Sequence, residues 1–134
     1  SLMILAVLLI LIVISGISKA IMDTLQFHFD QSIFRKLGSW WNPLISWVNK
    51  YRWFQGNKIL TWLISNPFVL LTDAWHFFQS LYSISFAAAF LVSGIYYPIF
   101  VAVIVYIANR LVFHIFYTYL FKHGKTKNAK NKHL

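Results

Sequence analysis

Residues 2–22 read LMILAVLLILIVISGISKAIM, an apolar run that is interrupted only by Ser15, Gly16, Ser18 and Lys19. A helix needs about 20 mainly apolar residues to cross a hydrocarbon core of roughly 30 Å, because it rises about 1.5 Å per residue. The run has this length and predicts a membrane-spanning helix. A cleaved signal peptide is the alternative, since residues 18–20 loosely fit a small-x-small cleavage site. We favour the span, because the run is longer than a usual signal-peptide core and the visible stretch has no basic segment before it.

Two more apolar runs of spanning length follow, at about residues 67–93 and 98–121. Only residues 94–97 separate them, so we expect an antiparallel helical hairpin. Pro67 and Pro98 are expected near the helix starts, where a missing backbone N–H costs little. The sequence therefore predicts an all-α integral membrane protein with three transmembrane helices, in which the whole chain forms one membrane domain.

The composition agrees with a membrane protein and excludes several kinds of chemistry. Hydrophobic residues make up 59% of the chain and charged residues only 11%, and ionisable side chains are costly in hydrocarbon. The absence of cysteine excludes disulfides, thiolate metal sites and cysteine nucleophiles. The net charge of +9 comes mostly from basic residues that flank the apolar runs. We therefore expect membrane lipids with anionic headgroups as partners, and no nucleic acid.

The basic residues also predict the orientation of the spans. Six of them lie at the end of the first run or before the second, and five follow the third in a basic tail at residues 122–134. Residues 94–97 carry no charge. Because cytoplasmic segments are enriched in Lys and Arg, we expect the N-terminus outside and the C-terminus in the cytoplasm of a multi-pass protein.

Residues 23–66, between the first two spans, are rich in tryptophan. Polar and basic residues alternate with five indoles, at Trp40, Trp41, Trp47, Trp53 and Trp62. An indole in the headgroup layer can bury its ring and hydrate its N–H. We expect short interfacial helices here, broken around Gly38, Pro43 and Gly56. Residues 58–65 are apolar enough to enter the membrane as a re-entrant piece, but too short to cross it.

The candidate site comes from the acidic residues, of which the chain has only three, each within five positions of a histidine. They are Asp23, Asp30 and Asp73. Ionisable groups in membrane spans are usually retained for function. Helical spacing puts Asp73 and His76 on one face of the second span, and Arg110 and His114 on one face of the third.

Counting along the hairpin extends this argument to depth. His76 is 17 residues from Ser93 and His114 is 16 from Pro98, so both are predicted to lie roughly 25 Å from the external end. His28 and the aspartates should lie on the same cytoplasmic side. We therefore expect one inner-leaflet cavity that gathers the acidic residues, the three histidines and Arg110.

Two kinds of chemistry suit this set. Imidazole and carboxylate groups can bind a transition metal or zinc, which would activate water or oxygen. The candidate metal ligands are His28, Asp30, His76 and His114. Alternatively, an Asp–His pair acts as an oriented base, while an arginine holds a phosphate or carboxylate of the substrate. The candidate catalytic residues are Asp23, Asp73 and Arg110, in a metal-dependent or acid–base enzyme that acts on a lipid-like substrate.

Structural roles explain the same residues. A lone His114 on a membrane helix more often bonds to another helix than to a ligand. Arg110 can pair with Asp73 or with a partner subunit, and the tryptophans are typical of an interfacial belt. The alternative function is a noncatalytic subunit of a larger membrane complex, or an oligomeric ion or proton pathway. Three helices cannot enclose a wide pore, so transport requires a homo-oligomer or a larger assembly.

Three stretches of the sequence carry a resemblance. They are KAIMDTLQFHFDQSIF (residues 19–34), WNPLISWVNKY (residues 41–51) and LTDAWHFFQ (residues 71–79). They resemble a group of short integral membrane proteins from Bacteroidota and similar bacteria, over the part of the chain that ends near Gln79. The resemblance implies a location in the bacterial inner membrane and that the three stretches belong together, but it transfers no activity.

Overall fold

The computed structural model describes residues 1–121, which form helices and turns without a β-strand. Three helices in this part of the chain are long and apolar enough to cross a membrane. They are α1 (Leu2–Phe27), α5 (Ala74–Tyr96) and α6 (Phe100–Ile115), which continues as the π-helical segment η5 (Phe116–Phe121). The predicted all-α fold with three spans is thus confirmed.

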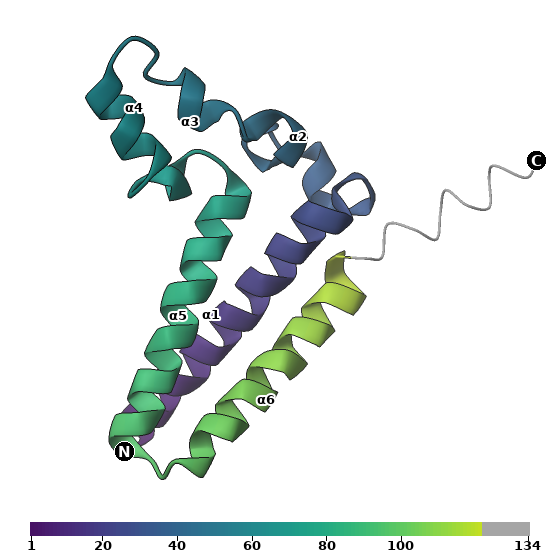
Figure 1. The fold of residues 1–134 in the computed structure, drawn as a ribbon. Coiled ribbons are helices and arrows are strands. Elements are labelled where there is room, and N and C mark those ends of the chain that lie inside the picture. The colour runs from purple at the N-terminus through teal and green to yellow at the C-terminus, as the bar shows by residue number, and fades with distance from the viewer. Residues whose placement is uncertain (122–134) are drawn as a thin grey trace, which may run out of the picture.

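The spans form an antiparallel bundle that is centred on α1. Helix α1 packs against α5 and against α6, whereas α5 and α6 touch each other little and diverge from their connection (Figure 1). The N-terminus lies at the same end of the bundle as this connection, and the helices between α1 and α5 lie at the opposite end (Figure 1). The bundle therefore has a hairpin end and a head end.

Helix α1 crosses α6 closely at a glycine. A Cβ added to Gly16 would lie 2.5 Å from Val112 Cγ1 and 3.2 Å from the backbone oxygen of Asn109. At the same level the buried Asn109 Nδ2 donates to Ser15 Oγ over 2.6 Å, and Ser15 Oγ donates to the carbonyl of Ile12. Small residues and interhelical hydrogen bonds are the usual means of packing membrane helices. Ser15 and Gly16, two of the four interruptions of the first apolar run, thus serve helix packing.

The second span begins later than predicted. Asp73 is the N-cap of α5, with extended backbone angles (φ −157°, ψ 162°), and its side chain accepts a hydrogen bond from the backbone N–H of His76. Pro67 lies in a turn before the short 3-10 helix η4 (Val69–Leu71). The prediction of a helix start near Pro67 is therefore wrong, because an acidic cap close to the apolar run determines the first turn.

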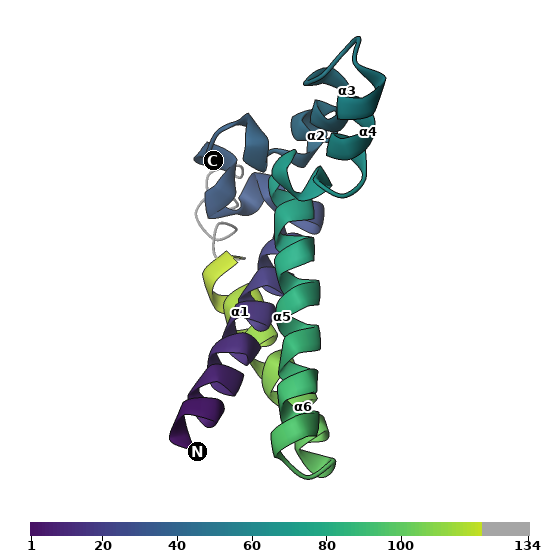
Figure 2. The same ribbon diagram turned by 90° about the vertical axis from the view of Figure 1, so that its left-hand side faces the viewer.

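The segment between α1 and α5 forms short helices, as predicted. They are η1 (Phe29–Gln31), η2 (Ile33–Lys36), η3 (Ser39–Trp41), α2 (Pro43–Ser46), α3 (Asn49–Arg52) and α4 (Lys58–Ser65). Figure 2 shows α3 and α4 extending beyond the start of α5. Trp40 Nε1 donates to the carbonyl of Leu71, and Asn49 Nδ2 donates to that of Thr72. These bonds fasten the segment to the chain just before Asp73.

Candidate functional site

The candidate site is built around Asp73, a residue that is only 3% exposed. Its Oδ1 accepts from the backbone N–H of His76 over 2.8 Å, and its Oδ2 lies 2.7 Å from His76 Nδ1. The hydroxyl of Thr72 lies 3.3 Å from the same Oδ2. Burial raises the pKa of the Asp73 carboxyl, but hydrogen bonds from the side chain and backbone of His76 outweigh it, so the pKa lies below its ordinary value. Asp73 is thus held as a carboxylate.

This carboxylate determines which tautomer the neutral imidazole of His76 adopts. An ionised carboxylate only accepts hydrogen bonds, so His76 Nδ1 must carry the hydrogen that lies between the two side chains. In the neutral ring, Nε2 then holds the free lone pair. The side chain of His76 is 23% exposed, and Nε2 has no hydrogen bond to any residue in the range 1–121. The geometry is that of an oriented base with an available nitrogen.

A pocket of about 300 Å³ opens beside this pair, and we call it the Asp73 pocket. Its walls come from the end of α1, from α2 and from the start of α5: Gln26, Pro43, Leu44, Ser46, Trp47, Asp73, Trp75 and His76. Most of this lining is apolar. The indole Nε1 of Trp75 is buried and has no hydrogen-bond partner within residues 1–121.

A second pocket of about 200 Å³ adjoins the first, and we call it the Asp30 pocket. It is lined by Leu25, Gln26, Phe27, His28, Phe29, Asp30, Gln31, Pro43 and Leu44. Gln26, Pro43 and Leu44 line both pockets. The Asp73–His76 pair therefore lines one pocket and the His28–Asp30 pair lines the other, and the two pockets share a wall.

The other predicted site residues line neither pocket. Asp23 forms an ion pair of 3.0 Å with Lys19 on α1. Arg110 places its guanidinium 4.9 Å from the centroid of the Phe113 ring, and it has no carboxylate within ion-pair distance among residues 1–121. His114 is on an exposed face of α6. Two pockets at the head end and separate side chains along the bundle thus take the place of the expected single cavity.

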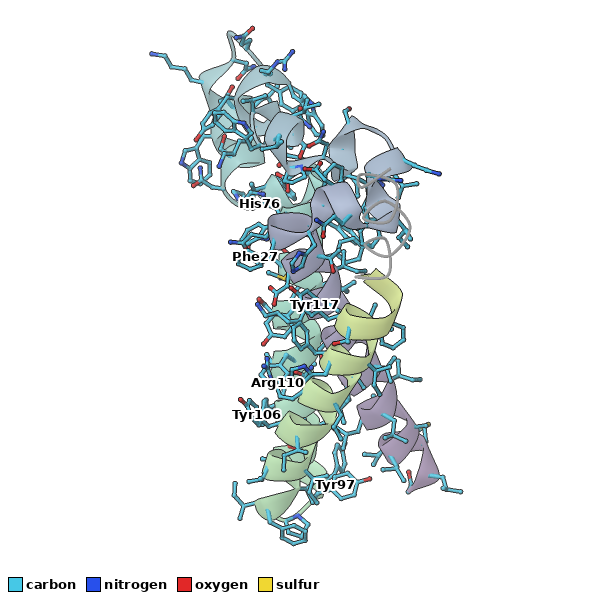
Figure 3. All side chains as sticks on the ribbon, turned by 90° about the vertical axis from the view of Figure 1, so that its right-hand side faces the viewer. Phe27, His76, Tyr97, Tyr106, Arg110 and Tyr117 are labelled. Atoms are coloured by element: carbon cyan, nitrogen blue, oxygen red, sulfur yellow. The ribbon has the colours of Figure 1, made fainter. Side chains whose placement is uncertain are left out.

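The predicted match in depth between two histidines is wrong. Helix α5 continues from His76 to Tyr96 before it reaches the hairpin, whereas α6 begins at Phe100 and soon reaches His114. At about 1.5 Å per residue, His76 is roughly 30 Å from the hairpin and His114 roughly 21 Å. Figure 3 agrees, because His76 lies farther toward the head end than Tyr117, which itself follows His114 on the chain. The error came from the predicted helix bounds, since α5 ends later and α6 begins later than expected.

The described part of the chain does not show the predicted metal site. Among residues 1–121, no three His, Asp or other candidate ligand side chains lie close enough together to hold a metal ion. The ring centroid of His28 lies 5.6 Å from that of Tyr117. His28 lines the Asp30 pocket, whereas the Asp73–His76 pair lines the Asp73 pocket. A bound transition metal or zinc remains a prediction.

Sequence reasoning missed several residues of the site. Trp75, Gln26 and Leu44 were not among the predicted site residues, and Pro43 was predicted only as a break between short helices. The signal for the pair itself was present, because an Asp three residues before a His at the start of an apolar run fits an N-cap. No signal in the sequence links residues 26, 43 and 75.

Comparisons with known proteins add no assignment. No protein-family model, curated protein or solved structure matches this chain. A function must therefore follow from the geometry of the site.

Proposed function

We propose that the protein is a membrane enzyme that acts on a lipid-like substrate, with His76 as general base and Asp73 as the residue that orients it. One observation carries the proposal: buried Asp73 holds His76 Nδ1 at 2.7 Å and leaves Nε2 available beside a mostly apolar pocket. Burial and a specific partner at a pocket are typical of catalytic groups.

The reaction class that suits this pair is ester hydrolysis. His76 Nε2 removes a proton from water as the water oxygen attacks the ester carbonyl, and Asp73 stabilises the resulting imidazolium. The imidazolium then returns the proton to the leaving alkoxide, so that water is added across the ester and an acid and an alcohol are released. Phosphoryl transfer fits less well, because it relies on cationic groups or metal ions around the phosphate, and neither pocket is lined by Lys or Arg.

The place of the pocket supports a lipid-like substrate. It lies at the head end of the bundle, where α1 ends and α5 begins. Leu44 and Trp47 line the pocket and are exposed, so an acyl chain can reach it from the bilayer. Concave sites of this size with few polar groups commonly hold apolar ligands.

The charge pattern favours the cytoplasmic leaflet for this pocket, and the resemblance to bacterial membrane proteins implies the inner membrane. Cysteines introduced singly at Ile95 and Leu44, both exposed, test the orientation. A membrane-impermeant thiol reagent added to intact cells should label the first and not the second. Labelling of Leu44→Cys from outside would contradict the proposed orientation.

Lipid turnover in nanodiscs tests the proposed activity. The purified protein is incubated with a bacterial polar lipid extract, and the lipids are compared by mass spectrometry over time. The wild type should convert a lipid ester, and His76→Gln should lower the rate about 10²- to 10⁴-fold, the usual contribution of a general base. Asp73→Asn should also lower the rate while preserving an acceptor for the cap. His114→Gln is the matched control and should keep the rate. No conversion by the wild type, or an unchanged rate in His76→Gln, would reject the proposal.

A second candidate, a noncatalytic subunit of a membrane complex, rests on Arg110. This residue lies in the middle of the third span (Figure 3) and has no carboxylate partner within residues 1–121. An unpaired charge in hydrocarbon is costly, so an acidic group from another chain would stabilise it. Native electrophoresis of gently solubilised membranes should then show a smaller complex for Arg110→Leu, but not for the control Arg35→Leu. Equal sizes for both variants and the wild type would remove this candidate.

A further inference from the structure

Ser46 lines the Asp73 pocket together with the Asp73–His76 pair. It is the last residue of α2 and is only 2% exposed. Its backbone N–H donates to the carbonyl of Asn42 over 2.9 Å, so the short helix holds the residue in place. The side-chain hydroxyl forms no hydrogen bond within residues 1–121. Ser46 thus brings a buried and unpartnered hydroxyl to the pocket of the proposed base.

This state is unusual for a buried hydroxyl in this protein. A buried Ser or Thr in a helix commonly donates to the carbonyl three or four residues earlier. Most buried hydroxyls among residues 1–121 do this, namely those of Ser15, Thr24, Ser32, Thr72, Ser85 and Ser93. Within the same range the buried exceptions are Ser18 and Ser46, and of these two only Ser46 lines the Asp73 pocket.

The oxygen of Ser46 is also accessible. Among the residues 1–121 that are not exposed, Trp75 Nε1 is the only side-chain nitrogen or oxygen that is both fully covered and unpartnered. The unpartnered oxygen of Ser46 therefore keeps some accessible surface, and the pocket is the space that this residue lines. Such a hydroxyl has bonding capacity for a ligand or for the imidazole.

We infer that Ser46 is the nucleophile of the proposed hydrolysis, so that the reaction passes through an acyl-serine. Ser46, His76 and Asp73 are the three members of a Ser–His–Asp triad, in which the carboxylate orients the imidazole and the imidazole activates the hydroxyl. Ser46 Oγ and His76 Nε2 are not hydrogen-bonded in this structure. Catalytic hydrogen bonds of this kind commonly tighten only in the substrate complex.

The reaction then has two halves. His76 Nε2 takes the hydroxyl proton as Ser46 Oγ attacks the ester carbonyl, and the imidazolium returns this proton to the alkoxide, which leaves as the alcohol. The acyl group stays on Ser46. Next, His76 takes a proton from water as the water oxygen attacks the acyl-serine. The bond from the acyl carbon to Ser46 Oγ breaks, the acid leaves, and the proton returns to Ser46.

Covalent labelling is the first test, and it needs no lipid turnover. The full-length protein in nanodiscs is incubated with an alkyl fluorophosphonate, and the adduct is located by mass spectrometry of its peptides. Ser46 Oγ should attack the phosphorus, with loss of fluoride, and give one adduct at Ser46. His76→Gln should slow this labelling about 10²- to 10⁴-fold, and Ser46→Ala should abolish it. Ser18→Ala is the matched control, because Ser18 is equally buried and unpartnered but lines neither pocket. It should keep the wild-type rate of labelling.

The second test separates a nucleophile from a structural serine. Residues that act as a unit have non-additive effects on the rate. Ser46→Ala and His76→Gln together should therefore slow lipid turnover no more than either substitution alone, whereas independent roles would multiply the two losses. Ser46→Ala should unfold at the same denaturant concentration as the wild type, because the hydroxyl has no hydrogen bond to lose.

The outcomes distinguish this inference from the proposed function on which it rests. No adduct on Ser46, labelling at an equal rate in His76→Gln, or multiplied losses in the double variant would overturn the inference. Lipid turnover that continues in Ser46→Ala would also overturn it, and would leave hydrolysis by direct attack of water. A His76-dependent adduct on Ser46 without turnover of any lipid would preserve the nucleophile and reject the lipid substrate.

Discussion

Two buried polar clusters among residues 1–121 differ in the hydrogen-bonding capacity that they leave unused. At the crossing of α1 and α6, Asn109 donates to Ser15, Ser15 donates to the backbone of its own helix, and Gly16 lies against Val112 without room for a methyl group. At the head end, Asp73 holds His76, while a pocket remains beside them.

The difference shows that a buried polar side chain in a membrane helix is not in itself a sign of chemistry. The crossing cluster is closed and close-packed, so it can only hold helices together. The head-end cluster retains an available imidazole nitrogen and a volume for a ligand. Unused bonding capacity beside a cavity therefore separates a candidate site from a packing contact.

The largest stability effect is expected at the head end, from Asp73→Ala. This variant loses the N-cap bond, about 0.5–2 kcal/mol, and a charge-assisted bond to His76, about 1.5–3 kcal/mol. We expect a loss of roughly 2–4 kcal/mol in the free energy of unfolding, measured by denaturant titration in detergent micelles. Asp73→Asn keeps one acceptor and should lose less. A loss for Asp73→Ala as small as that of an exposed site, below about 0.5 kcal/mol, would show that the pair is not structurally ordered.

At the crossing, Gly16→Ala should have the next largest effect. The new methyl group would lie 2.5 Å from Val112 Cγ1 and 2.7 Å from its Cβ, so α6 must move outward. Overpacking of this kind costs about 1–3 kcal/mol. Gly94→Ala is the matched control, because nothing lies within 4 Å of its added Cβ. Adding Val112→Ala to Gly16→Ala should restore stability. Equal unfolding free energies for Gly16→Ala and Gly94→Ala would contradict the close crossing.

The hydrogen bond of the crossing cluster should contribute less. A double-mutant cycle with Asn109→Ala and Ser15→Ala should give a coupling energy of about 0.6–2 kcal/mol, the range for bonds between membrane helices. The measurement is the unfolding free energy of the wild type, both single variants and the double variant. Lipid turnover should be unchanged in all four proteins that fold, since this cluster has no part in the reaction. Additive effects would mean that the two side chains do not interact.

The smallest expected effect is the pH dependence of the head end. Because hydrogen bonds from His76 lower the pKa of Asp73 in the folded protein, this residue contributes stability that is fully present above the pKa of the unfolded chain. The contribution is lost as the pH falls below about 4 and through the lowered folded pKa. Unfolding curves recorded from about pH 6 to about pH 3 should show a steeper loss for the wild type than for Asp73→Asn, which has no proton to gain. Parallel curves would contradict the lowered pKa.

The sequence determined the features that depend on local interactions and on transfer to hydrocarbon. Runs of apolar residues predict the three spans because their length must match the bilayer core. The contact between Asp73 and His76 follows from spacing, because the side chain of an N-cap aspartate reaches the residue three positions later. The short helices between α1 and α5 follow from the breaks at Gly38, Pro43 and Gly56.

Tertiary structure decided what lies between elements that are distant in sequence. Ser15 and Asn109 are 94 positions apart, and no local signal pairs them. The relative depth of His76 and His114 changed with small shifts in the helix bounds, because each residue moves a side chain about 1.5 Å along the axis. Likewise, only the folding of α2 against the ends of α1 and α5 brings Gln26, Leu44 and Trp75 around one pocket. Local energetics fixes which elements form, whereas packing fixes which side chains meet.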